Sequence, residues 1–164
     1  MSIAQSFVDS LSFFPDWLIV VIISLLPFIE LRGALPIAII VLDMNPILAF
    51  ALCVISNMVP IPFLLVFLKR AEKWLRKYPY WEKKMDWWFA RTRKKAKKTI
   101  EKYEVLGLML FVGVPLPITG AWTGSLIAYL FDLDIKKSFF TILAGVIIAG
   151  SIILVLSVFF NIYV

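Results

Sequence analysis

Two long hydrophobic stretches of this chain are each interrupted near the centre by polar and helix-breaking residues. The first stretch, 16–42, is interrupted at Pro27–Pro36, and the second, 105–131, at Pro115–Gly124. Lipid offers no hydrogen bonds to free backbone groups, so a broken helix persists in a membrane only where protein or a wet cavity surrounds it. Two such interruptions in corresponding halves of a chain are typical of a transport site.

Two further hydrophobic runs, 46–68 and 138–163, are uninterrupted and long enough to cross a hydrocarbon core of about 30 Å as helices. Gly145, Gly150 and Ser151 give the second run a face of small residues suited to close helix packing. Hydrophobic residues make up 62% of the chain, and the mean hydropathy is +0.92. These values predict an all-α, multi-pass protein of the cell membrane.

The polar segments are predicted to lie at the membrane surface. Residues 2–15 place apolar side chains near helical spacing, which predicts an interfacial helix. Segment 69–104 carries 14 Lys and Arg against 5 Asp and Glu, with aromatic residues at spacings of three and four. It is predicted to form basic helices on the cytoplasmic side, with 69–98 contacting anionic lipid rather than nucleic acid.

The chain contains no His and a single Cys, Cys53. It therefore lacks the usual ligands of zinc and the side chains of a His-based proton relay. No metal and no cofactor are expected. Without a nucleophile–base pair, no enzymatic activity is expected either.

Each interrupted stretch either crosses the membrane once or enters and returns on the same side. If 105–131 returns, Lys136 and Lys137 lie on the side of 69–104, as the preference of basic residues for the cytoplasm requires. This favours one membrane domain, 1–164, of two inverted repeats, each a re-entrant hairpin followed by a transmembrane helix. A shift of 90 positions superposes Pro27 on Pro117, Ala38 on Ala128 and Phe50 on Phe140.

Glu30 and Arg32 are the outstanding candidates for chemistry, because each costs about 2.5–3.5 kcal/mol in the middle of a membrane. The functional hypothesis makes Glu30 a proton carrier and lets Arg32 hold an anionic group such as a phosphate. The alternative is an ion pair that pins the hairpin tip. Residues two apart do not face each other on a helix, so pairing requires irregular backbone.

Other residues complete the predicted substrate site. Asn57, near the centre of 46–68, is an amide that needs partners if buried. Thr119 either contacts substrate or caps a helix, and Trp122 either stacks on substrate or seals the tip. The remaining tip residues are predicted to shape the turns and start the returning helices: Pro27, Gly33, Pro36, Pro115, Pro117, Gly120 and Gly124.

The segments 30–36 (ELRGALP) and 115–124 (PLPITGAWTG) resemble the two signature stretches of the small multidrug export protein family. The resemblance covers most of the chain, in order, with Ile118 where the family often has Gly. The family is distantly similar to the DedA superfamily, whose members include lipid scramblases and carrier-lipid translocases, and this implies facing re-entrant hairpins. That superfamily places acidic residues on the first hairpin, matched by Glu30. It places arginines near the second, where this sequence has none between Lys102 and Lys136, so Arg32 of the first hairpin is the only candidate substitute.

The sequence therefore predicts a transporter whose substrate binds between two hairpin tips. Three hypotheses remain: proton-coupled export of small amphipathic or phosphate-bearing molecules, lipid or carrier-lipid translocation, and a non-transporting scaffold that works through 69–104. Two full spans do not easily enclose a pathway, so a homodimer is expected.

Overall fold

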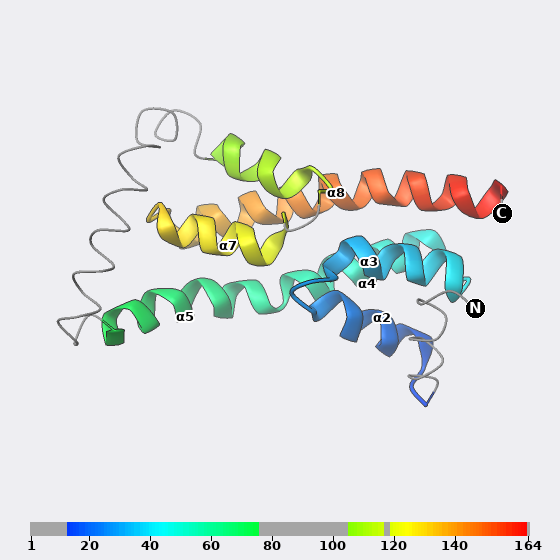
Figure 1. Ribbon diagram of the computed structural model, residues 1–164, viewed down its shortest axis with the longest axis horizontal. Coiled ribbons are helices and arrows are strands. Elements are labelled where there is room, and N and C mark those ends of the chain that lie inside the picture. The colour runs from blue at the N-terminus through cyan, green and yellow to red at the C-terminus, as the bar shows by residue number, and fades with distance from the viewer. Residues whose placement is uncertain (1–12, 76–104, 117–118, 164) are drawn as a thin grey trace.

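The computed structural model describes residues 13–75, 105–116 and 119–163, and the regular elements in these ranges are helices (Figure 1). Most of the predicted interfacial helix 2–15, most of the basic segment 69–104 and Pro117 lie outside the described residues. Two helical spans are long and apolar enough to cross a membrane, Pro46–Arg70 and Ile135–Asn161, with mean hydropathies of 2.3 and 2.8.

The first interrupted stretch forms a helical hairpin. Helix α2 (Asp16–Leu25) ends before Pro27, and the chain returns alongside it as α3 (Glu30–Pro36) and the π-helical turn η1 (Ile37–Val41) (Figure 1). Pro27 has no amide hydrogen and disfavours a helical residue before it, so the helix stops there.

Gly33 and Pro36, which were expected to shape the turn and start the returning helix, lie inside that helix instead. The turn is formed one helical turn earlier, at 26–29, and is closed by a 2.9 Å hydrogen bond from the Glu30 amide to the Leu26 carbonyl. Pro36 removes one amide from the helical ladder, and the wider π-helical turn follows it directly.

The first long span follows this hairpin. Helices α4 (Pro46–Met58) and α5 (Pro60–Leu75) are separated at Val59, because Pro60 cannot donate to the preceding turn. Asn45 caps α4 by accepting hydrogen bonds from the amides of Ile47 and Leu48, at 3.0 and 3.2 Å.

The second interrupted stretch repeats this plan. A helix over residues 105–113 ends before Pro115, and the chain returns as α7 (Ala121–Leu130) (Figure 1). The second long span, α8 (Ile135–Tyr163), begins three residues before the predicted start at 138. Asp134 allows this earlier start by accepting a 3.0 Å hydrogen bond from the Lys137 amide.

The tips of the two hairpins meet in the middle of the molecule, between the two long spans (Figure 1). Helix α3 packs on α4 and α8, whereas α7 packs on α5 and α8. Two glycines of α8 permit close packing. A Cβ at Gly145 would lie 2.8 Å from the Met109 carbonyl oxygen of the helix over 105–113, and one at Gly150 would lie 2.8 Å from Phe50 Cε2 of α4. Ser151, predicted on the same face, is exposed and bonds the Ile147 carbonyl.

The outer surface of the molecule is apolar. Ile47, Phe63 and Val155 are 76%, 75% and 68% exposed, and they belong to the two long spans. A soluble protein rarely exposes large apolar residues so continuously, whereas lipid covers them at no cost. The described residues therefore form a membrane protein.

Both hairpins end in the same way. Asp43 and Asp132 adopt left-handed backbone conformations with φ of 48° and 55°, which ends the returning helix. Hydrogen bonds of 2.9 Å close each end, from Met44 to Ala38 and from Leu133 to Ala128. The next residues, Asn45 and Asp134, cap the two long spans.

Asp43 and Asp132 are 89 positions apart, whereas Ala38 and Ala128 are 90 positions apart. The first hairpin holds one more residue between its closing hydrogen-bond partners, at the place where η1 widens the helix. Beyond that point Phe50 corresponds to Phe139, which packs on the core, rather than to Phe140, which is 65% exposed.

Candidate functional site

Glu30 is the first residue of α3 and stands at the tip of the first hairpin. It is 5% exposed, and its backbone is left-handed, with φ of 51°. A residue with a Cβ adopts this conformation at a cost of about 1–2 kcal/mol. Such strain persists where the surrounding structure fixes it, and it is common at functional sites.

The Glu30 carboxylate contacts the beginning of α7 in the second hairpin. Its Oε2 accepts a hydrogen bond from the Ala121 amide at 3.2 Å, and its Oε1 accepts one from the Trp122 amide at 3.3 Å. The first amides of a helix have no partner within it, and the helix dipole favours an anion there. Glu30 therefore caps a helix of the opposite hairpin.

Arg32 contacts the other side of the same interruption. Its Nη2 donates to the carbonyl oxygens of Val112 at 3.0 Å and Val114 at 3.4 Å, where the helix over 105–113 ends. These carbonyls have no partner within the helix because the helix stops before Pro115, and the helix dipole favours a cation there. Glu30 and Arg32 thus satisfy backbone groups on the two sides of the interruption. The carboxylate accepts from the first amides of α7, and the guanidinium donates to a carbonyl at the end of the helix over 105–113.

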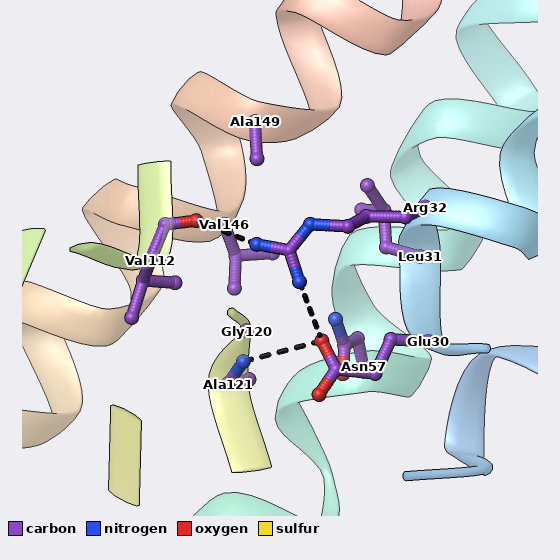
Figure 2. A pocket seen from close by; sticks show the side chains of 9 residues that line it. All are labelled: Glu30, Leu31, Arg32, Asn57, Val112, Gly120, Ala121, Val146 and Ala149. Carbon is purple, nitrogen blue, oxygen red and sulfur yellow. Dashed lines mark hydrogen bonds and ion pairs between the residues drawn. The ribbon is translucent and has the colours of Figure 1, made fainter. Parts of the chain in front are cut away.

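Glu30 and Arg32 also pair with each other, with 3.4 Å between Oε2 and Nη1 (Figure 2). The pairing requires irregular backbone, and the left-handed conformation of Glu30 supplies it. The pair contacts both sides of the second interruption, which is the arrangement that an ion pair pinning the hairpin tips requires.

Gly120 makes room for this contact. A Cβ at this position would lie 2.5 Å from Arg32 Nη1 and 2.6 Å from Glu30 Cδ, closer than atoms can approach. Gly124, one turn along α7, is packed against Val112, whose Cγ2 would be 2.6 Å from an added Cβ. Gly120 thus allows close approach of the two hairpins, whereas Gly124 allows close approach of the two arms of the second hairpin.

A cavity of about 10 Å³ remains beside the pair, close to the space that one water molecule needs. Glu30, Arg32 and Asn57 line it, together with Gly120 and five apolar residues (Figure 2). Residues of the two halves meet here: Glu30 and Gly120 are 90 positions apart, and Asn57 and Val146 are 89 positions apart. The polar side chains of this cavity come from the first half of the chain.

Four buried side-chain atoms of the described residues have no hydrogen-bond partner, and three belong to residues of this contact. They are Arg32 Nε, Asn57 Oδ1 and Trp122 Nε1. Buried polar atoms are nearly always paired, so a cluster of unpaired ones requires an explanation. Arg32 and Asn57 line the cavity, so one donor and one acceptor are available there for a ligand or for water.

Thr119 and Trp122, which were also predicted to contact substrate, take part in hydrogen bonds within the protein. Thr119 Oγ1 bonds the carbonyls of Val114 and Leu116, at 2.9 and 2.8 Å, so its hydroxyl holds the turn. Trp122 contributes its backbone amide to Glu30, and its side chain is partly buried. Substrate contact by these two residues, by Asn57 and by the charged pair stays a prediction.

Sequence reasoning did not identify the partners of the charged pair, which are the carbonyls of Val112 and Val114 and the amides of Ala121 and Trp122. Backbone groups carry no residue-type signal. The rule that each helix end leaves four groups unpaired, applied to the break at Pro115, would have indicated them.

The charges at the end of the second hairpin have ordinary structural roles. Asp132 pairs with Lys69 at 3.5 Å between exposed side chains, which joins the end of α5 to the end of α7. Asp134 caps α8, and the hydrogen bond from the Lys137 amide lowers the pKa of its carboxyl group.

The fold and this contact define an all-helical membrane protein with an ion pair held between two broken helices at its centre. A family model described as "Putative small multi-drug export protein" matches residues 30–152, from Glu30 through both interruptions. The chain belongs to this family, whose name indicates a transporter and not an enzyme. No curated protein and no solved structure was found to match the chain.

Proposed function

We propose that the protein is a proton-coupled exporter of small amphipathic or phosphate-bearing molecules. The observation that carries this proposal is the contact between the hairpin tips, where a buried carboxylate and a guanidinium lie among unpaired polar atoms in an apolar molecule. Ionisable groups at membrane depth are expensive and usually mark a substrate or proton pathway.

The proposed architecture is a pair of facing re-entrant hairpins in two inverted repeats. The matched left-handed aspartates and helix caps support two repeats. Each hairpin also returns to the end of the molecule from which it came, and the two come from opposite ends (Figure 1). In this proposed arrangement irregular backbone lies at mid-depth of the membrane, which is tolerated where the backbone is buried in protein or lines a wet cavity.

Protonation of Glu30 is the coupling step of the mechanism. The charged carboxylate attracts the amides of α7 and Arg32, and a neutral carboxyl group attracts them much less. Proton binding thus loosens the contact between the hairpins. An anionic group of the substrate can then take the place of the carboxylate between Arg32 and the start of α7.

Translocation of a lipid or carrier lipid is a second candidate, favoured by the exposure of the tips. Phe28 and Leu116, at the two interruptions, are 96% and 55% exposed. A headgroup could enter from the side while its chains stay in the bilayer. We also propose a homodimer and contact of 69–98 with anionic lipid, as the sequence predicts.

Reconstituted liposomes separate the two candidates. An exporter moves a fluorescent amphipathic dye in response to an imposed pH difference, and dissipating that difference stops the movement. A scramblase equilibrates labelled phospholipid between the leaflets without any gradient. Dye movement that ignores the pH difference would contradict proton coupling.

The re-entrant topology predicts which residues share a side of the membrane. With Cys53 replaced by Ala, single cysteines at Asp16 and Asp43 should react with an impermeant thiol reagent from the same side. A cysteine at Asp132 should react from the opposite side. All three positions are exposed in the structure. Labelling of positions 16 and 43 from opposite sides would show that the first stretch crosses the membrane.

A further inference from the structure

Asn57 holds a buried acceptor that no donor reaches. The residue is 1% exposed and lies near the end of α4, one turn before the break at Pro60. Its Oδ1 has no hydrogen-bond partner among the described residues. An unpaired carbonyl in an apolar interior is destabilising, so this acceptor needs a donor in some state of the protein.

The hydrogen-bond partners of Glu30, by contrast, are donors and not acceptors. The Ala121 amide, the Trp122 amide and the Arg32 guanidinium are all donors. They suit a carboxylate, which only accepts, but they offer nothing to the O–H of a protonated carboxyl group. A proton on Glu30 therefore needs an acceptor from elsewhere.

Asn57 and Glu30 line the same cavity of about 10 Å³ (Figure 2). Asn57 Oδ1 is the unpaired side-chain acceptor of that cavity among the described residues. The space suffices for about one water molecule between the two groups.

We propose that Asn57 Oδ1 accepts the hydrogen bond of protonated Glu30, directly or through one water molecule. Asn57 then acts as a positioning residue that holds the proton-bound state of the site. This inference rests on the proposed function, and it assigns to α4 the acceptor that proton coupling requires. With Glu30 turned towards α4, the amides of α7 and Arg32 are free for an anionic substrate group.

In the described part of the chain, no charged residue other than Arg32 lines the cavity beside Glu30 and could alter its protonation. Arg32, on the same helix, is the charged residue that faces Glu30. The other residues that line the cavity are not ionisable: Leu31, Asn57, Val112, Gly120, Ala121, Val146 and Ala149.

Infrared difference spectroscopy of the reconstituted protein tests the inference without transport. Titration towards acidic pH produces the C=O stretching band of protonated carboxyl groups, and its loss in Glu30→Gln identifies the Glu30 contribution. In Asn57→Leu this band should move to the frequency of a carboxyl group without a hydrogen-bond acceptor. Its titration midpoint should fall by about one pH unit, the worth of one hydrogen bond.

Ser125→Ala is the matched control, because it removes a buried hydroxyl of α7 that bonds the Ala121 carbonyl at 2.7 Å. Its Glu30 band should stay unchanged. Asn57→Ala serves as a second variant if leucine disturbs the helices, whose content the amide band reports. An unchanged Glu30 band in a folded Asn57 variant overturns the inference and leaves the proposed function intact. The lack of any Glu30 band in the unaltered protein contradicts proton coupling itself, and the inference with it.

Discussion

Replacing Glu30 with glutamine is expected to reduce proton-linked dye movement in liposomes to the level of protein-free liposomes. Glutamine has nearly the same shape, and its oxygen can still accept from the start of α7. It cannot bind and release a proton, so the coupling step is lost. Movement of the dye under an imposed pH difference is the measurement.

The same substitution is expected to lower the free energy of unfolding, because Arg32 loses its counter-charge. Removing one partner of a fully buried ion pair costs about 3–5 kcal/mol. The loss here should be smaller, because 18% of the Arg32 side chain is exposed and Nη2 keeps its bond to the Val112 carbonyl.

Asp43→Asn is the matched control for Glu30→Gln. Asp43 is also an acidic residue with left-handed backbone, but it is exposed at the far end of the same hairpin. Its conversion to an amide should leave proton-linked movement unchanged. Equal losses in both variants would indicate damage to the hairpin, and full activity of Glu30→Gln would contradict the assigned proton carrier.

The long spans could be predicted from the sequence because hydropathy over about 20 residues is a strong signal. The first span begins at the predicted Pro46, whereas the second begins three residues before its predicted start, since a cap, and not the apolar residues, sets where a helix starts. Asp134 illustrates this: it lies in a polar segment, yet its side chain allows α8 to begin at Ile135.

The interruptions could also be located from their prolines, but the geometry of the charged pair could not. The pair depends on one left-handed residue, Glu30, which no residue-type preference indicates. It also depends on backbone groups of a segment about 90 residues away, which approach only because Gly120 lacks a side chain. The sequence also did not indicate why Ala38 and Ala128 are 90 positions apart but Asp43 and Asp132 only 89. The π-helical turn η1, which widens the first returning helix, explains this difference.

Replacing Gly120 with alanine is expected to separate the hairpin tips without unfolding the two long spans. The added Cβ would overlap the ends of the Glu30 and Arg32 side chains. These ends can move, but only by giving up their hydrogen bonds to the Ala121 amide and the Val112 carbonyl. Hydrogen bonds to charged groups are worth about 1.5–3 kcal/mol each, so proton-linked movement should fall about tenfold or more.

Gly107→Ala provides the control within the same hairpin. No atom lies within 4 Å of a Cβ added at Gly107, which belongs to the helix over 105–113. Alanine there should leave movement unchanged and stabilise the helix by up to about 1 kcal/mol. Because both variants add the same methyl group to the same hairpin, a loss confined to Gly120→Ala locates the working contact at the tips. Wild-type movement in Gly120→Ala would mean that transport does not depend on the charged pair held there.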